Sequence, residues 1–163
     1  MDQQQASARQ AVDTFESAIP VLLVEDNEID VEITRRLLTS IGVPIRLYIA
    51  RDGEEALSLL LEPKTADIAA QQAALPKLIL LDLRLPTMDG LDLLRRIKRD
   101  SNLCPIPVAM LTGVTGDRPM LQCMEAGANM YFTKPMTAGD IIGVVETVQK
   151  YWVVMEGLRR RTG

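Results

Sequence analysis

Five side chains that suit phosphoryl chemistry each follow a short apolar segment of the chain. Glu25 and Asp26 come directly after the first such segment, and Asp82 ends the third. Thr112 ends the fourth segment, and Lys134 follows the fifth. Three close carboxylates repel one another and favour a hard divalent cation such as Mg²⁺, and an aspartate can act as a nucleophile that forms an acyl phosphate. A metal ion, the Lys134 ammonium and the Thr112 hydroxyl would together stabilise a transferred phosphoryl group.

Each of these residues has a simpler explanation when it is taken alone. An aspartate after a strand is most often a helix cap or a turn residue, and Asp26 fits a cap of the helix that follows it. Lys134 and Pro135 fit an ordinary loop. Their joint occurrence at four strand ends of one sheet is harder to explain in this way, and it favours a shared site.

The hydrophobic pattern predicts strands and helices that alternate five times. Apolar strands without period-two alternation are expected in a parallel sheet that is covered on both faces. The expected strands are residues 21–24, 45–50, 78–81, 108–111 and 130–132, and the expected helices are residues 28–41, 53–61, 91–97, 119–126 and 141–158. Residues 62–76 are expected to form an insertion or an extended loop. The fold class is therefore α/β, with a doubly wound parallel sheet and a site beyond the carboxyl ends of its strands.

Composition excludes several function classes. The 163 residues fit one domain, and the 18 basic and 22 acidic residues give a net charge of −4, which makes nucleic-acid binding a poor hypothesis. The absence of histidine removes Ser-His-Asp and Cys-His chemistry and any phosphohistidine donor role. The apolar segments are far shorter than a membrane span. Cys104 and Cys123 make no CxxC motif, and they are expected to be reduced, buried thiols of a cytoplasmic protein.

The chain resembles the receiver domain of bacterial two-component response regulators, which have a chemotaxis-type fold. The motifs that carry the resemblance are LLVEDN with Glu25 and Asp26, LILLDLRLPTMDG with Asp82, MLTG with Thr112, and YFTKP with Tyr131 and Lys134. They imply a flavodoxin-like sheet with strand order 2-1-3-4-5 and an extended final helix. Residues 1–18 would form an arm that is flexible or a short helix, residues 19–150 the receiver domain, and residues 151–163 the end of the last helix and a tail.

The resemblance implies that Asp82 accepts a phosphoryl group from a sensor histidine kinase, with Lys134 and Thr112 assisting. It also implies that Mg²⁺ is held by Asp26, Asp82 and the backbone carbonyl of Arg84, with Glu25 acting mostly through water.

Thr112 and Tyr131 would be the switch pair of such a receiver. On phosphorylation the Thr112 hydroxyl would move to the phosphate, and Tyr131 would rotate inward. Such a protein catalyses its own phosphorylation and slow dephosphorylation, and it is not a turnover enzyme on an external substrate.

The chain looks most like the stand-alone regulators that serve bacterial phytochromes. The features in common are VEDNEIDVEIT, ARDGEEAL, the long segment before LILLDL and an extended last helix that contains QKYW. They imply a bacteriophytochrome as the kinase partner and no effector domain after the last helix, although each feature also occurs in other single-domain receivers.

Two other function classes remain open. One is a pseudo-receiver, a scaffold or interaction protein without phosphoryl chemistry, which the intact set of site residues argues against. The other is a small hydrolase with Asp82 as nucleophile. Phosphatases of that type carry a second acid two residues later, where this chain has Arg84.

The last predicted helix carries more apolar surface than one sheet contact requires. Its two apolar stripes share Val148 and Met155. We expect Tyr151, Trp152 and Leu158 to remain partly exposed beyond the edge of the domain, as one apolar patch. Such a patch is typical of an interface. A homodimer around Tyr151, Trp152, Met155 and Leu158 is therefore expected, unless the N-terminal arm covers the patch instead.

Overall fold

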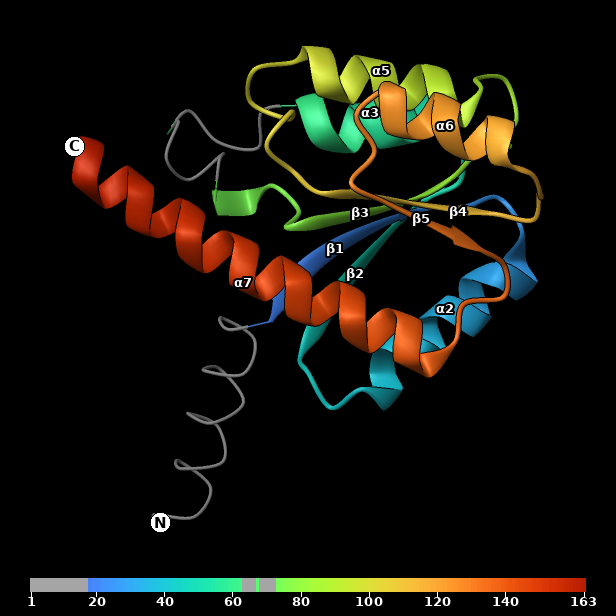
Figure 1. Ribbon diagram of the computed structural model, residues 1–163, viewed down its shortest axis with the longest axis horizontal. Helices are drawn as coiled ribbons and strands as arrows, with labels where there is room; N and C mark the ends of the chain where they lie inside the picture. The colour runs from blue at the N-terminus through green and yellow to red at the C-terminus, as the bar shows by residue number, and fades with distance from the viewer. Residues whose placement is uncertain (1–17, 63–66, 68–72) are drawn as a thin grey trace.

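A parallel sheet forms the middle layer of the protein (Figure 1). The structure is a computed structural model and describes residues 18–62, 67 and 73–163. The strands are β1 (Ile19–Val24), β2 (Ile45–Ala50), β3 (Leu78–Asp82), β4 (Val108–Thr112) and β5 (Met130–Thr133). They are parallel throughout and lie in the order β2-β1-β3-β4-β5. The expected fold class and strand order are therefore confirmed.

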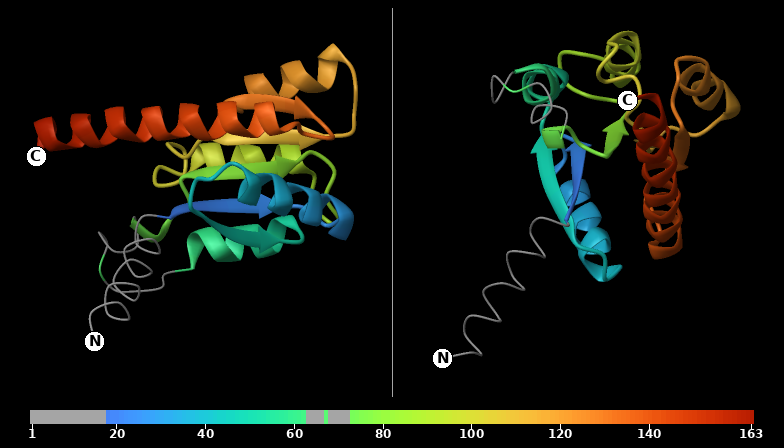
Figure 2. Two further views of the ribbon diagram at one scale, coloured as in Figure 1. Left: turned by 90° about the horizontal axis from the view of Figure 1, so that it is seen from below. Right: turned by 90° about the vertical axis from the view of Figure 1, so that its left-hand side faces the viewer.

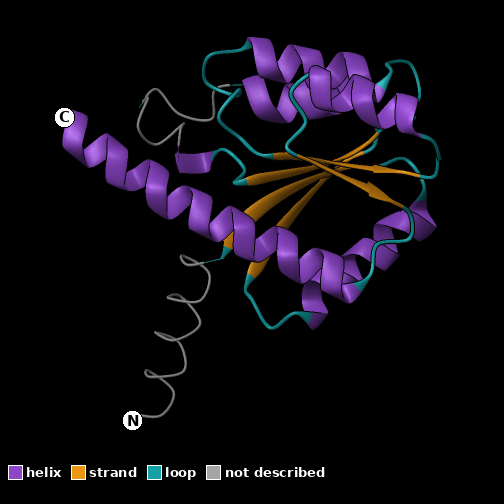
Figure 3. Cartoon of the chain, in the orientation of Figure 1, coloured by secondary structure: helices purple, strands orange, loops and turns teal. Residues whose placement is uncertain are grey.

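Helices cover both faces of the sheet. Helices α2 (Glu28–Ser40) and α7 (Ala138–Thr162) lie on one face. Helices α3 (Gly53–Leu61), α5 (Gly90–Arg99) and α6 (Asp117–Glu125) lie on the other (Figure 3). Because both faces are covered, the central strands β3 and β4 are buried along their whole length. Their uninterrupted apolar sequences follow from this burial.

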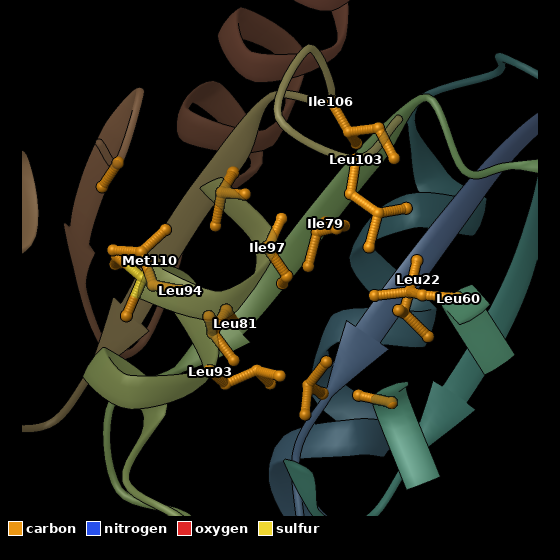
Figure 4. Packing of buried hydrophobic residues seen from close by; sticks show 14 of the residues in the cluster. Leu22, Leu60, Ile79, Leu81, Leu93, Leu94, Ile97, Leu103, Ile106 and Met110 are labelled. Carbon is orange, nitrogen blue, oxygen red and sulfur yellow. The ribbon is translucent and has the colours of Figure 1, made fainter. Parts of the chain in front are cut away.

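Two hydrophobic clusters separate the sheet from its helices. Leu22 and Val24 belong to the cluster under α3, α5 and α6, part of which Figure 4 shows. Val21 and Leu23 point to the cluster under α2 and α7. Since both faces are apolar, alternation alone does not fix the register of β1. The buried Glu25 that follows the strand favours this register, because a slip would separate its carboxylate from Lys134.

Polar side chains at the carboxyl ends of strands start the helices. The Asn27 side chain accepts hydrogen bonds from the backbone of Ile29 and Asp30 at the start of α2. Asp52 and Asp89 cap α3 and α5 in the same way. Such caps satisfy backbone donors that have no partner within the helix. The loops that carry the acidic side chains are therefore held by the helices that follow them.

Helix α7 is longer than the sequence pattern predicted. The pattern covered residues 141–158, whereas the helix spans Ala138–Thr162. Thr137 and Asp140 form a reciprocal capping box, so the helix starts earlier in the chain than the pattern predicted. At the other end, Arg159 and its neighbours place positive charge on the last turn. The C-terminal part of α7 projects well beyond the sheet (Figure 2).

Tyr151 and Trp152 tie α7 to its own domain. The Tyr151 hydroxyl donates to the Pro105 carbonyl at 2.6 Å, and the Trp152 indole N–H donates to the Lys77 carbonyl at 2.8 Å. The Lys77 ammonium also lies 4.1 Å from the Trp152 ring centroid. The sequence predicts partly exposed rings that lie beyond the edge of the domain. They lie half-buried against it, because their polar tips find backbone partners there.

The exposed apolar face of α7 consists of other residues. Val153 and Val154 are 71% and 60% exposed, and Leu158 is 51% exposed. Met155 is half-buried. Of the patch predicted from the sequence, Leu158 is therefore the member that is mainly exposed. The alternative, that the N-terminal arm covers this patch, involves residues outside those that the structure describes.

The loop after β3 is tightly constrained. A hydrogen bond of 2.7 Å from the Met88 N–H to the Pro86 carbonyl closes a three-residue turn around Thr87, whose φ is +66°. At Gly90, a Cβ atom would overlap the carbonyl oxygen of Asp82 and lie 2.7 Å from that of Leu83. Gly90 is thus required by the close approach of two backbones.

The two cysteines differ in their surroundings. Both are free thiols, and Cys123 is buried as expected, but Cys104 is exposed. The prediction that both are buried was wrong for Cys104, which lies in the loop between α5 and β4 and not on a packed helix face. Among the described residues, no helix is both long enough and apolar enough to cross a membrane.

The close approach at Gly90 predicts a large effect of a small substitution. Gly90→Ala should lower the free energy of unfolding by about 1–3 kcal/mol, the usual cost of overpacking. Gly143→Ala, at an exposed helical position with open space, should raise it by up to about 1 kcal/mol. Urea unfolding of both variants tests this. Equal changes in the two variants would contradict the steric argument.

Candidate functional site

Neighbouring strand ends bring the predicted acidic residues together. Glu25 and Asp26 follow the end of β1, and Asp82 ends β3, which pairs directly with β1. The Glu25 N–H donates to the Ala50 carbonyl at the end of β2, which holds the acidic loop at the edge of the sheet. One carboxylate oxygen from each of the three acids lies within 4.8 Å of the other two. The structure thus assembles the cluster that the sequence predicted.

Lys134 bridges this cluster from the end of β5. Its Nζ lies 2.5 Å from Glu25 Oε2 and 3.1 Å from Asp82 Oδ2. A third carboxylate, Asp30 Oδ2, lies 3.0 Å from the same ammonium. The Lys134 N–H donates to the Thr112 carbonyl at 2.8 Å, so the backbone of β4 positions the lysine. The Lys134-Pro135 peptide bond is cis.

The three clustered carboxylates suit a divalent cation. Glu25 and Asp82 are buried and Asp26 is exposed, so the set is open to solvent on one side. The Asn27 N–H donates to Glu25 Oε1, and the Arg84 N–H donates to Asp82 Oδ1, which orients both carboxylates. Hard oxygen ligands of this kind favour Mg²⁺ or a similar ion. The cluster therefore fits the metal that the sequence implied.

The two predicted switch residues meet at the backbone of Val114. Thr112 is fully buried, and its Oγ1 accepts a hydrogen bond of 3.0 Å from the Val114 N–H. The Tyr131 hydroxyl donates to the Val114 carbonyl at 3.3 Å. Tyr131 is half-buried beside the cluster under α6. The loop after β4 is thus the common partner of both hydroxyls.

Burial and charge act in opposite directions on the bridging pair. Burial raises the pKa of Glu25 to about 7, against the lowering effect of its hydrogen bonds with Lys134 and Asn27. Burial alone would lower the pKa of Lys134, but its hydrogen bonds to Glu25 and Asp30 and the charge of Asp82 raise it above its ordinary value. The ammonium therefore stays charged, while Glu25 is the group that titrates near neutral pH.

Asp30 is the site residue that the sequence analysis missed. It lies in the first turn of α2, three residues after the Asn27 cap. Side chains of a helix lean toward its N-terminus, so this one reaches back over the edge of the sheet. The three-residue spacing between the Asn27 cap and Asp30 was the sequence signal that could have identified this residue. Arg51 was also missed, and it forms a close ion pair with Glu28.

Comparison with known proteins finds one family along most of the chain. A family described as the response regulator receiver domain matches residues 21–146.

The chain belongs to this receiver family.

Two relatives cover most of the receiver. A probable methanogenesis regulatory protein, FilR2 of Methanothrix harundinacea, is 35% identical over 86% of this chain and 89% of its own length. The response regulator Rcp1 of Synechocystis is 32% identical over 82% of this chain and 88% of its own length. Both relatives are thus matched over most of their own length.

Solved structures agree with these sequence matches. The phosphorylated cyanobacterial phytochrome response regulator RcpA has a TM-score of 0.66 at 31% identity, over 83% of this chain and 94% of that one. The Mn²⁺-bound form of Rcp1 has a TM-score of 0.64 at 31% identity, over 82% and 94%. The bacteriophytochrome response regulator AtBRR has a TM-score of 0.67 at 33% identity, over 81% and 93%.

The raised pKa of Glu25 predicts a pH dependence of the metal-free receiver. The folded state keeps a proton on Glu25 up to about pH 7, whereas the ordinary value is 4.5. This stabilisation is fully present below about 4.5 and is lost as the pH rises through about 7. The free energy of unfolding should therefore fall by roughly 3 kcal/mol across this range.

Urea unfolding in EDTA at several pH values measures this change. Glu25→Gln should remove most of the decrease, and Glu54→Gln, at an exposed position on α3, should leave it. An undiminished decrease in Glu25→Gln would assign the titration to another group.

Proposed function

We propose that this receiver is a single-domain response regulator of a two-component phosphorelay. In this proposal Asp82 accepts a phosphoryl group from a sensor histidine kinase, and the conformational response controls contacts with other proteins. The observation that carries it is the Lys134 ammonium, 3.1 Å from Oδ2 of Asp82, an acid that clusters with Glu25 and Asp26. A pseudo-receiver has no need for this arrangement.

The proposed reaction moves one phosphoryl group without oxidation or reduction. An Asp82 carboxylate oxygen forms a bond to phosphorus while the bond from phosphorus to the donor's imidazole nitrogen breaks. The electron pair of the broken bond leaves with that nitrogen. The Lys134 ammonium and the Thr112 hydroxyl stabilise charge on the transferred oxygens. Asp82 then carries the group until water removes it, so no external substrate is turned over.

Mg²⁺ is the metal we propose for the acidic cluster. Asp26, Asp82 and the backbone carbonyl of Arg84 would hold it, with Glu25 beside them. When bound, the ion neutralises the charge that builds up between the carboxylates and the phosphoryl group. Support comes from the oxygen-only cluster and from the Mn²⁺-bound form of a relative.

Thr112 and Tyr131 are proposed to carry the signal away from Asp82. The Thr112 Oγ1 accepts a hydrogen bond from the Val114 N–H, and its own O–H is the group that would donate to a phosphoryl oxygen. Its movement would release the loop after β4, whose carbonyl accepts from Tyr131. Reorientation of the Tyr131 ring would then follow from the loss of a fixed partner.

A bacteriophytochrome is the kinase class we propose as partner. Support comes from the similarity to phytochrome response regulators in sequence and in structure. The free thiols Cys104 and Cys123 agree with a cytoplasmic location, where such a kinase domain would meet the receiver.

Phosphorylation is tested most directly by intact-mass measurement after addition of MgCl₂ and acetyl phosphate. The wild type should gain the mass of one phosphoryl group, and EDTA should prevent this gain. Asp82→Asn should gain nothing because it lacks the nucleophilic oxygen, and Asp26→Asn should require far more Mg²⁺. Asp92→Asn, at an exposed position on α5, should behave as the wild type does.

Other results would support other functions. No adduct on a folded wild type with either acetyl phosphate or a phosphorylated kinase would indicate a pseudo-receiver. Rapid release of many equivalents of phosphate would indicate a hydrolase.

We also propose a homodimer around α7. Tyr151 and Trp152 hold the helix on its own domain, and Val153, Val154 and Leu158 remain exposed along the projecting part. Burial of this face, together with Met155, by the same face of a second copy gives a two-fold interface. In each subunit, the hydrogen bonds of Tyr151 and Trp152 would hold α7 in place beneath this interface.

Light scattering tests the dimer. The wild type should have twice its chain mass of 18.0 kDa at micromolar concentration. Val154→Glu with Leu158→Glu should give a folded monomer, because two charges would oppose their symmetry mates. Leu61→Glu, at a similarly exposed position on α3, should remain a dimer. A monomeric wild type, both with and without phosphorylation, would exclude this interface.

A further inference from the structure

The donors of Lys134 are fully used before any phosphoryl group arrives. An ammonium has three N–H donors and no acceptor. In this structure its three partners are the carboxylates of Glu25, Asp30 and Asp82, at 2.5, 3.0 and 3.1 Å. A phosphoryl oxygen that takes a hydrogen bond from Lys134 must therefore displace one of these acceptors.

The three acceptors differ in how easily they can be displaced. Glu25 is 2% exposed, and its second oxygen is held by the Asn27 N–H, so its release would leave a buried charge without its partner. Asp82 is 9% exposed and is the group that reacts. Asp30 is 35% exposed, and water can replace the ammonium at its carboxylate. Asp30 is thus the acceptor that yields at least cost.

Asp30 also stands apart from the acids that suit a metal ion. The group whose oxygens lie within 4.8 Å of one another contains Glu25, Asp26 and Asp82, and Asp30 is not in it. The Asp30 carboxylate does contact the same Lys134 ammonium that contacts Asp82. Its charge therefore acts on the lysine directly, through the 3.0 Å contact.

We propose that Asp30 is a positioning residue that occupies the third donor of Lys134 in the unphosphorylated receiver and yields this donor to the phosphoryl group. The proposal rests on the proposed function, because it assumes that Asp82 is the phosphoacceptor. Asp30 stabilises only the unphosphorylated arrangement, so it opposes phosphorylation at equilibrium. Transfer forms the bond from Asp82 oxygen to phosphorus and breaks the donor's bond to phosphorus, and Lys134 changes acceptor without losing its proton.

Removal of Asp30 should therefore strengthen the binding of a phosphoryl mimic. The probe is the fluoroberyllate anion BeF₃⁻, which attaches to a carboxylate oxygen as a phosphoryl group does. Its dissociation constant is measured by fluorine NMR at saturating Mg²⁺. Asp30→Ala should bind BeF₃⁻ about two- to fivefold more tightly than the wild type, in keeping with the loss of one partly exposed ion pair. Asp30→Asn, which keeps a neutral oxygen acceptor, should lie between the two.

Asp92→Ala is the matched control. Asp92 is also an acid in the first turn of a helix, and it forms an ion pair of its own with Arg95 at 3.2 Å. Its replacement by alanine changes the net charge by the same amount as Asp30→Ala does. Asp92→Ala should bind BeF₃⁻ as the wild type does. A purely structural role of Asp30 would weaken binding or leave it unchanged, so tighter binding is specific to the competition. If Asp30→Ala does not fold, as judged by circular dichroism, the nearly isosteric Asp30→Asn decides alone.

The outcomes separate this proposal from the proposed function. A wild type that binds no BeF₃⁻ and gains no phosphoryl group would contradict both. A wild type that binds, with a dissociation constant unchanged or weaker in the Asp30 variants, would overturn the role of Asp30 and leave Asp82 as acceptor. If Asp92→Ala bound BeF₃⁻ more tightly to the same extent, net charge alone would explain the effect, and this too would overturn the proposal.

Discussion

The structure depends on one ammonium among carboxylates. Glu25, Asp30 and Asp82 come from a loop, a helix and the end of a strand, and each would repel the others if Lys134 were absent. A buried carboxylate is costly unless it is paired, and Glu25 is almost completely buried. The lysine therefore joins the ends of β1, β3 and β5, which are far apart in the chain and are not all neighbours in the sheet. The charge that remains beyond this pairing favours a divalent cation.

The parallel topology is what makes this arrangement possible. All carboxyl ends of the strands meet at one edge, and helices close both faces, so this edge is where polar side chains can gather without entering the core. The same topology explains the restriction at Gly90. The chain must turn back from Asp82 onto α5 within a few residues, and its backbone passes so close to the end of β3 that no side chain fits. The position of the acidic cluster and the tight turn at Gly90 thus both follow from the parallel arrangement of the strands.

The sequence predicted those features that depend on local pattern. Apolar runs located four of the strands and alternation located residues 45–50, and the polar residues at four strand ends located the site, because position in a parallel sheet follows from position in a strand. Three features depended on contacts that a pattern does not contain. Asp30 reaches Lys134 through the tilt of its helix, Trp152 finds the Lys77 carbonyl in the folded chain, and Gly90 is required by close backbone approach. Each of these three contacts joins residues that are distant in sequence or that come together only when the backbone has folded.

Strand β3 is held at both of its ends by the segment that forms β5 and α7. At the carboxyl end, Asp82 contacts Lys134, which lies four residues before α7 begins. At the amino end, Lys77 accepts a hydrogen bond from Trp152 of α7, one residue before β3 begins. The segment from Lys134 to Trp152 therefore runs along the strand that carries Asp82 and contacts the chain at both ends of that strand. Lys134 stands in the loop that leads into helix α7, so a short stretch of chain joins the acidic cluster to the start of that helix.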